Sequence, residues 1–325
     1  MLNKNLKIGV VIPSYKVRLQ IGRVLAKIGP EVSCIIIVDD FCPEGTGAFV
    51  LSKLMDPRIH VIFNENNIGV GGSVLRGYHK AIELGCDVLV KIDGDDQMDP
   101  ALISRFAAPI QFGRADYVKG NRFFSPEYLS GMPKIRLYGN AFLSMLTKLS
   151  SGYWNIFDPT NGYTAIHASL IEYLTKSKID SRYFFESDML YRLGTLGAVV
   201  AEVPMRAVYG DERSNLIIRK IAFDFLFKNL KNTIKRIIYR YFVRDFSFAS
   251  LELFFGVIFF VFGFLYGAFH WLESIQSGIP STSGQVMISA LPILVGFQMV
   301  LGFINYDIQS TPKSVIHTEL MRGDH

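Results

Sequence analysis

Cysteine is scarce in this sequence, and its pattern argues against two classes of structure. The 325 residues include three cysteines, Cys34, Cys42 and Cys86, which have neither metal-ligand spacing nor an even number for pairing. We therefore expect no cysteine-based metal site and no disulfide framework. The three thiols are expected to be reduced, in core or turn positions of a cytosolic domain.

Two further patterns are missing. The glycine-rich segment at residues 67–73 does not end in Gly-Lys-Ser or Gly-Lys-Thr, and it does not follow the first apolar run. It is therefore neither a phosphate-binding loop of the Walker type nor a dinucleotide fingerprint. The first apolar run has a lysine before it and ends within a few residues at Pro13, which is typical of a strand rather than of a signal peptide.

Charge is limited to a net +5 and is unevenly distributed. Basic residues gather between positions 219 and 244, interleaved with Phe, Leu, Ile and Tyr. This pattern favours an anionic membrane surface over nucleic acid as the partner. Half of the residues are hydrophobic, and the excess lies after residue 250. The composition predicts a globular part followed by a membrane part.

Short apolar runs alternate with segments of helical period near the N-terminus. The runs cover residues 7–12, 33–38, 58–63 and 86–92, and the helical segments cover 17–28, 45–55 and 70–84. This alternation predicts βαβ units and a parallel sheet covered on both faces. Polar clusters follow the four runs, and the carboxyl edge of such a sheet is where ligands bind.

The most informative cluster is Asp93-Gly94-Asp95-Asp96-Gln97, at the end of the fourth run. Carboxylates in an Asp-x-Asp arrangement repel each other unless a cation or a proton lies between them. Hard cations such as Mg²⁺ take oxygen ligands and often keep phosphate oxygens in their coordination shell. A metal–diphosphate site is therefore one interpretation. An acidic turn with Asp99 as the N-cap of the next helix is the other.

A glycine-rich loop, residues 67–73, opens the third helical segment. Its backbone N–H groups could contact a phosphate, although tight turns use glycine for other reasons as well. Arg76 follows within two helical turns and faces either the ligand edge or the solvent.

Taken together, these motifs resemble the family 2 glycosyltransferases of GT-A fold. The matching motifs are Pro13-x-Tyr15, Val38-Asp39-Asp40 followed by Glu44-Gly45-Thr46, Asn67-x-Gly69 and Asp93-x-Asp95-x-Gln97. Later segments resemble, more narrowly, the polyprenyl-phosphate glycosyltransferases related to dolichol-phosphate mannose synthase. These are Lys119 to Arg122, Lys134-Ile135-Arg136 with Asn140, Asp158 to Tyr163, and Glu202-Val203-Pro204. The resemblance covers about residues 7–216 and implies an α/β, Rossmann-like domain.

The resemblance implies a role for each group of residues. Mg²⁺ or Mn²⁺ is expected on Asp95, with Asp93 and Gln97 close by. The nucleoside-diphosphate sugar is expected near Pro13, Tyr15, Asp39, Asp40, Asn67, Gly69, Arg76, Asp93 and Asp95. The lipid phosphate is expected near Arg122, Lys134, Arg136, Asn140 and Arg213. Besides Asp95, the candidate catalytic carboxylates are Asp158, Glu186 and Asp188, although Glu186 and Asp188 would also suit the start of a helix.

Two departures from the family pattern affect the donor site. Lys16-Val17 stands where the family often has Asn-Glu after the first-strand tyrosine, which leaves the base preference open. The segment Tyr209 to Asn215 replaces an Arg-x-x-Gly-x-Ser-Lys pattern, and Arg213 is the cation that we take as its substitute.

Two apolar runs, Leu251 to Leu272 and Val286 to Tyr306, are each long enough to cross a bilayer. The connection between them, Glu273 to Gly284, contains no Lys or Arg, so the positive-inside rule predicts that it faces outward. We expect a GT-A domain at 1–210, basic amphipathic juxtamembrane helices at 211–249, a transmembrane hairpin at 250–307 and a cytoplasmic tail at 308–325. The expected location is the bacterial inner membrane, with both termini and the catalytic domain cytoplasmic.

The activity that the resemblance implies is inverting transfer of a sugar from a nucleoside-diphosphate sugar to a polyprenyl phosphate, such as undecaprenyl or dolichyl phosphate. One alternative is transfer to a hydroxyl of a lipid-linked glycan, which needs a general base. A second is a non-catalytic nucleotide-binding membrane module. A processive polysaccharide synthase is disfavoured because the Gln-x-x-Arg-Trp segment of those enzymes is missing. The sequence leaves homo-oligomerisation through the spans, the sugar and the nucleotide base undetermined.

Overall fold

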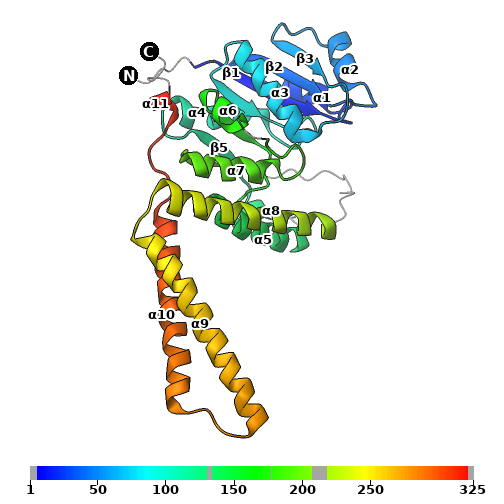
Figure 1. The fold of residues 1–325 in the computed structure, drawn as a ribbon. Coiled ribbons are helices and arrows are strands. Elements are labelled where there is room, and N and C mark those ends of the chain that lie inside the picture. Colours follow the sequence, from blue (N-terminus) through cyan, green and yellow to red (C-terminus); the bar gives the residue numbers. More distant parts are fainter. Residues whose placement is uncertain (1–5, 130–133, 177, 207–217, 321–325) are drawn as a thin grey trace. The chain divides into compact units, whose positions relative to one another are not determined.

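The computed structural model (Figure 1) describes residues 6–129, 134–176, 178–206 and 218–320. The chain forms two compact units. The first comprises residues 1–233 and 312–325, and the second comprises residues 234–311.

A seven-stranded sheet organises the first unit. Its strand order is β3 (Ile59–Phe63), β2 (Val32–Asp39), β1 (Ile8–Ser14), β4 (Val88–Lys91), β6 (Thr164–His167), β5 (Tyr117–Asn121) and β7 (Val200–Pro204). The first four strands are mutually parallel, and β6 runs antiparallel to both of its neighbours. The expected mostly parallel sheet is confirmed, and the carboxyl ends of β1 to β4 lie at one edge.

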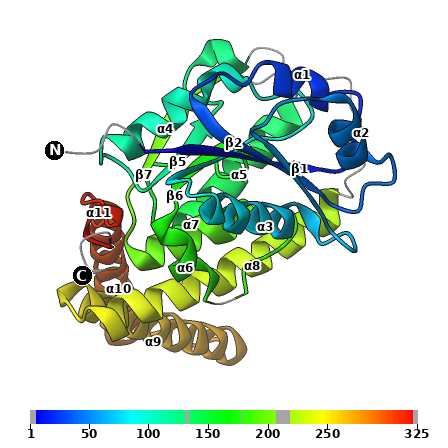
Figure 2. The same cartoon turned by 90° about the horizontal axis from the view of Figure 1, so that it is seen from above.

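Helices cover both faces of this sheet (Figure 2). One apolar layer packs α1 (Ile21–Ala26), α2 (Thr46–Lys53) and α4 (Ile103–Gln111) on the sheet. The other packs α3 (Gly69–Glu83), α6 (Ser169–Thr175) and α7 (Phe185–Leu196). Successive strand residues alternate between the layers, as for Val10 and Val11, because neighbouring side chains of a strand point to opposite faces. Both faces are therefore buried, which explains the continuous apolar runs in the sequence.

Two longer helices complete the first unit. α5 (Lys134–Ser151) packs on α7, and α8 (Ile218–Ile238) continues into the second unit. A buried hydrogen bond from Ser150 Oγ to Asn229 Oδ1, at 2.6 Å, connects α5 to α8.

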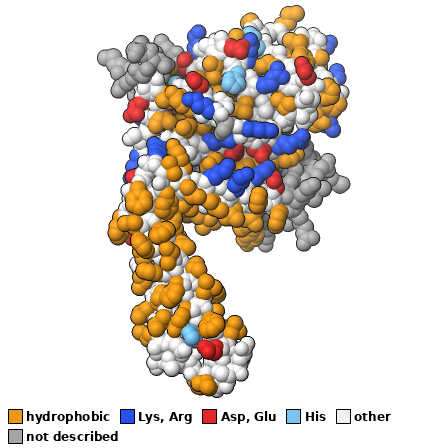
Figure 3. All heavy atoms as spheres, in the orientation of Figure 1, with side chains coloured by type: hydrophobic (Ala, Val, Ile, Leu, Met, Phe, Trp, Pro, Cys, Tyr) orange, Lys and Arg blue, Asp and Glu red, His pale blue; other side chains and the backbone are white. Residues whose placement is uncertain are grey.

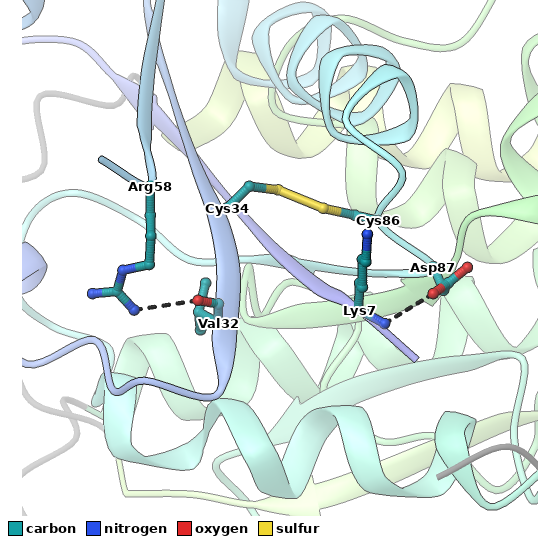
Figure 4. Close-up of a disulfide and its surroundings, with 6 residues drawn as sticks. All are labelled: Lys7, Val32, Cys34, Arg58, Cys86 and Asp87. Atoms are coloured by element: carbon teal, nitrogen blue, oxygen red, sulfur yellow. Dashed lines mark hydrogen bonds between the residues drawn. A yellow bond between two sulfur atoms is a disulfide. The ribbon is translucent and has the colours of Figure 1, made fainter. Parts of the chain in front are cut away.

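Two of the three cysteines are bonded to each other, although the sequence predicted three reduced thiols. The sulfur atoms of Cys34, on β2, and Cys86, before β4, are joined as a disulfide across β1 (Figure 4). Their Cα atoms are 7.5 Å apart. Gly9 on β1 makes this approach feasible, since a Cβ there would lie 2.9 and 3.1 Å from the two sulfur atoms. The expectation that all three cysteines are unpaired is therefore wrong for this pair, because the sheet order, rather than the spacing in sequence, brings them together. Cys42 is free.

The C-terminal segment returns to the first unit. Asp116, which is fully buried, accepts hydrogen bonds from the backbone N–H groups of Ile316 and His317 and pairs with Nδ1 of His317 at 2.7 Å. The His317 ring stacks on His167, with ring centroids 4.5 Å apart. Residues 312–320, ending in α11 (His317–Leu320), are thereby fixed to the sheet domain.

The second unit contains the end of α8 and a helical hairpin formed by α9 (Phe248–Ser277) and α10 (Ser283–Gln309). Both helices are long and apolar enough to cross a membrane, and Figure 3 shows apolar side chains along their outer surface. In the most apolar stretch of each helix, 22% and 11% of the residues are buried, whereas the core helix of a soluble protein is mostly buried. Small residues allow the two helices to approach closely, since a Cβ on Gly296 would lie 2.7 Å from the Gly256 carbonyl oxygen.

A buried polar cluster lies at the base of the hairpin. Asp307 of α10 accepts two parallel hydrogen bonds from Arg236, at 2.7 and 2.9 Å, and a third from the Tyr241 hydroxyl in η3 (Tyr239–Arg244). Arg236 is 1% exposed, so this bidentate pair compensates both buried charges.

Candidate active site

A cleft of about 430 Å³ opens at the carboxyl edge of the parallel strands. It is bordered by the ends of β1, β2 and β4, by the first turn of α3 and by the loop before α7. The lining residues are Pro13, Ser14, Tyr15, Val17, Asp40, Asn67, Gly69, Val70, Ser73, Asp93, Gly94, Asp95, Arg182 and Tyr183. Seven of the nine donor-site residues proposed from sequence line this cleft. The other two, Asp39 and Arg76, do not.

The three aspartates of the acidic motif after β4 have different surroundings. Asp93 and Asp95 line the cleft, and Asp95 Oδ1 accepts a hydrogen bond from the Gln97 backbone N–H. Asp96 adopts a left-handed backbone conformation, with φ of 65°. Its carboxylate pairs instead with Arg23 and Lys27, at 3.0 and 2.7 Å. The turn therefore presents two of its three aspartates, Asp93 and Asp95, to the cleft.

Asp39 and Asp40 organise the backbone around the cleft. Asp39, which is 3% exposed, accepts hydrogen bonds from the N–H groups of Cys42 and Gly47, at 2.7 and 2.6 Å. Asp40 accepts from Asn64 Nδ2 and from the N–H groups of Ile68 and Gly69, at 2.8 to 2.9 Å. A negative charge at the start of α3 is favourable because of the helix dipole. The protein's own carboxylate thus occupies the N–H groups of Ile68 and Gly69, two donors that the glycine-rich loop could have offered to a phosphate.

The glycines of this loop allow a second segment to approach closely. Gly71 N–H donates to the Ser181 carbonyl oxygen at 2.9 Å. A Cβ on Gly71 would lie 2.7 Å from the Asp180 carbonyl oxygen, and one on Gly69 would collide with the Ser181 carbonyl. The loop preceding α7 therefore packs directly on the first turn of α3.

A buried lysine connects Asp93 to α7. Lys91, whose side chain is 2% exposed, lies with Nζ 2.9 Å from Asp93 Oδ1 and 3.3 Å from Glu186 Oε1. Burial lowers the pKa of Lys91, but the charges of Asp93 and Glu186 outweigh burial and hold this pKa above its ordinary value. Lys91 therefore remains cationic and offsets the repulsion between neighbouring carboxylates.

Two other candidate carboxylates are also paired within the protein. Asp158 is fully buried and accepts from Nε and Nη2 of Arg122, at 2.7 and 2.8 Å. Asp188 accepts from the Asp180 N–H and from Arg192 Nε, at 3.0 and 3.2 Å. Neither of them lines the cleft. The catalytic roles assigned to them from sequence remain predictions.

The residues proposed for the lipid phosphate are only partly described. Lys134 and Arg136 begin α5, but their side chains lie outside the described part of the chain, as does the whole of Arg213. Asn140 is 9% exposed, and its Nδ2 has no hydrogen-bond partner among the described residues. The same holds for the hydroxyl of Ser144, one turn later on α5. An unpaired buried donor is costly, so most such groups in proteins have a partner. The assignment of Asn140 to the lipid phosphate remains a prediction.

Sequence reasoning missed the contribution of the loop before α7. Arg182 and Tyr183 line the cleft although they lie about 90 residues after the acidic motif. No motif marks them in the sequence, and only the packing of this loop on α3 brings them to the donor side.

Comparison with known proteins matches residues 9–175 to the model of glycosyl transferase family 2. The chain belongs to this family. It is thus a glycosyltransferase, and its sheet domain has the GT-A fold.

Several relatives share about 30% identity with this glycosyltransferase. The undecaprenyl-phosphate mannosyltransferase of Micrococcus luteus is 30% identical over 62% of this chain and 84% of the relative. The polyprenol monophosphomannose synthase of Mycolicibacterium smegmatis is 31% identical over 60% and 75%, respectively. A UDP-N-acetylglucosamine–dolichyl-phosphate N-acetylglucosaminyltransferase of Methanococcus voltae is 30% identical over 62% and 85%. The resemblance to the polyprenyl-phosphate group is therefore confirmed.

Solved structures support the fold. Glucosyl-3-phosphoglycerate synthase from Mycobacterium tuberculosis, in complex with UDP, superposes with a TM-score of 0.53 at 18% identity. The match covers 70% of this glycosyltransferase and 80% of that chain. Other crystal structures of the same synthase contain Mn²⁺ with UDP-glucose or Mg²⁺ with UDP.

Proposed function

We propose that this glycosyltransferase transfers a sugar from a nucleoside-diphosphate sugar to a polyprenyl phosphate at a membrane surface. The observation that carries the proposal is the combination, in one chain, of the Asp93/Asp95 cleft with two apolar helices of membrane-spanning length. The names of three relatives, each of which specifies a polyprenyl or dolichyl lipid, support the acceptor class. Because these names differ in the sugar, they leave the donor open.

The residues at the cleft fit a divalent cation. Mg²⁺ is commonly held by one or two carboxylates together with substrate phosphates, and Asp93 and Asp95 supply two carboxylates beside a cleft of suitable size. Among the described residues, no group of three or more His, Cys, Asp or Glu side chains could hold a metal by itself. The remaining ligands would therefore come from the donor diphosphate. A bound cation there supplies charge neutralisation for the leaving diphosphate.

The acceptor chemistry places modest demands on the protein. A phosphate monoester has a second pKa near 6, so at pH 7 it is mostly a dianion and already nucleophilic. The enzyme therefore has to bind and orient this phosphate rather than deprotonate it. In the proposed reaction, one phosphate oxygen attacks the anomeric carbon as the nucleoside diphosphate leaves from the opposite face, which inverts the configuration.

Polar atoms on α5 support an acceptor site close to the cleft. Asn140 Nδ2 and Ser144 Oγ are buried donors without partners among the described residues, and α5 packs on α7, whose Glu186 contacts Lys91. Arg122, Lys134, Arg136 and Arg213 remain the proposed cations for this phosphate.

The membrane topology that we propose places the catalytic domain and both flanks of the hairpin on the cytoplasmic face of the inner membrane. Residues 6–233 and 312–320 belong to the same compact unit, which requires an even number of crossings between them. The connection between α9 and α10 contains no Lys or Arg, in agreement with an outward position. Exposed apolar side chains on α8, among them Phe223, Phe227 and Leu230, are suited to lie against lipid.

In the decisive experiment, full-length protein in detergent is incubated with undecaprenyl or dolichyl phosphate and a panel of UDP- and GDP-sugars. The buffer contains Mg²⁺ or Mn²⁺. We expect one donor to give a lipid product whose mass equals that of the polyprenyl phosphate plus one sugar. Its anomeric configuration, measured by NMR, should be inverted relative to the donor. Transfer only to the hydroxyl of a lipid-diphosphate sugar, with polyprenyl phosphate inert, would contradict the proposal.

A further inference from the structure

Arg182 occupies a distinctive position in the donor cleft. Of the residues that line the cleft in the described part of the chain, it is the only lysine or arginine. The residue is exposed, and no ion pair with a described residue holds its guanidinium group. Its Cγ packs over the start of α3, 3.1 Å from the point where a Cβ on Gly69 would lie.

The loop that carries Arg182 is fixed on several sides. The Ser181 carbonyl accepts hydrogen bonds from the N–H groups of Gly71 and Gly72, at 2.9 and 3.4 Å. Asp180 pairs with Lys228 of α8 at 2.8 Å, and its Oδ1 accepts from the Arg182 N–H at 2.9 Å. The backbone of Arg182 is therefore held in place while its guanidinium group stays available.

Among residues 6–129, 134–176, 178–206 and 218–320, no other lysine or arginine lines the cleft to bind a diphosphate. The three carboxylates of the cleft belong to Asp40, Asp93 and Asp95. Asp40 takes its hydrogen bonds from the backbone at the start of α3, and the Lys91 cation is already shared by Asp93 and Glu186. Arg76, a sequence-based candidate, donates to Asn64 Oδ1 at 2.6 Å and lies outside the cleft lining.

We propose that the Arg182 guanidinium binds the diphosphate of the nucleotide-sugar donor in the cleft that Asp93 and Asp95 also line. The planar group donates two parallel hydrogen bonds to phosphate oxygens, which suits a diphosphate better than a lysine ammonium does. The inference rests on the proposed function, because it assumes that a nucleoside diphosphate enters this cleft. It assigns a phosphate contact to the loop before α7. Four N–H groups at the start of α3 already have acceptors within the protein, those of Ile68, Gly69, Gly71 and Gly72.

The test compares nucleotide binding by full-length wild type, Arg182→Gln and Arg182→Lys in detergent with Mg²⁺. The probes are UDP and GDP, and the phosphate-free controls are uridine and guanosine. Binding of each compound is measured by calorimetry and by saturation-transfer NMR. We expect Arg182→Gln to weaken the preferred diphosphate by about 10- to 100-fold while nucleoside binding changes less than about twofold. Arg182→Lys should keep part of the affinity. Arg105→Gln, at an exposed position on α4, is the matched control and should bind as wild type does.

Each outcome bears on a different statement. If wild type binds neither UDP nor GDP, the same measurement is made with CDP, ADP and dTDP, and binding of none of the five means that the proposed function fails. If wild type binds one and Arg182→Gln binds it equally well, the role of Arg182 is refuted while the proposed function stands. If Arg182→Gln weakens nucleoside and diphosphate to the same degree, the contact is not with phosphate and the inference is again overturned. A thermal midpoint within about 2 °C of wild type verifies that the variant is folded.

Discussion

Replacing Lys91 with methionine is expected to destabilise the first unit strongly. Lys91 is 2% exposed and contacts both Asp93 and Glu186, whose side chains are 33% and 12% exposed. Methionine fills a similar volume but leaves the Glu186 carboxylate largely buried without its cation. Breaking a buried pair by removing one partner costs about 3–5 kcal/mol. For a domain of 150–250 residues, this loss lowers the thermal midpoint by roughly 6–20 °C.

The assay is thermal unfolding of the full-length protein in detergent, followed by tryptophan fluorescence. Lys80→Met is the matched control, because Lys80 forms a surface pair with Glu83, whose side chain is 64% exposed, and such pairs contribute about 0–1 kcal/mol. The double variant Lys91→Met/Glu186→Gln removes the unpaired charge and should recover most of the loss. If Lys91→Met unfolds within about 1 °C of wild type, or the double variant is less stable than the single one, the reasoning about this buried pair is refuted.

Three further predictions follow from other features. Asp95→Asn should lower sugar transfer by at least about 100-fold without changing the thermal midpoint, and near-normal turnover with either metal would remove the metal assignment. Gly71→Ala should lower the free energy of unfolding by about 1–3 kcal/mol and weaken donor binding, because the new Cβ would lie 2.7 Å from the Asp180 carbonyl oxygen. Gly139→Ala is the control, since a Cβ on Gly139 would meet no atom within 4 Å. Equal effects of the two substitutions would contradict this account of the packing. Burial, together with the neighbouring His317, lowers the pKa of His167 to about 4, compared with about 6.5 in an unfolded chain. The unfolded chain therefore binds a proton at this histidine more readily than the folded protein does. As a result, the free energy of unfolding is highest above pH 6.5 and decreases by up to about 3 kcal/mol as the pH falls toward 4. Urea unfolding at pH 7 and pH 5 should therefore show a smaller acid-induced loss for His167→Gln than for wild type, and identical losses would exclude His167 as the cause.

The elements of the parallel half could be predicted because their signals are local. The four apolar runs became β1 to β4 with boundaries shifted by one or two residues, and the helical segments between them became α1 to α3. Strands buried on both faces need continuous apolar residues, and this demand is visible in the sequence. The polar residues after the strands likewise reached one edge because parallel strands share their direction.

The roles of individual acidic residues could not be predicted in the same way. Asp39 and Asp40 are adjacent, yet only Asp40 lines the cleft, and both accept backbone N–H groups. The family resemblance made Asp158 a candidate catalytic carboxylate, and the fold brings Arg122 to it from 36 residues away. Whether a carboxylate is available for chemistry depends on which cations and N–H groups surround it, and these come from distant parts of the chain.

The cysteines show the same dependence on strand order. Cys34 and Cys86 are separated by 52 residues and by an intervening strand, β1. Their contact requires the absence of a side chain at Gly9, which no cysteine spacing reveals.

By itself, the sequence determined the α/β class, the polar edge, the family and two helices of membrane-spanning length, since periodicity, residue type and run length are properties of contiguous segments. Tertiary structure alone decided that Lys91 neutralises Asp93 and Glu186, that α3 begins against Asp40, and that Arg182 reaches the donor cleft. Those decisions depend on distances between residues far apart in the chain, and such distances are set only when the sheet and its covering helices have packed.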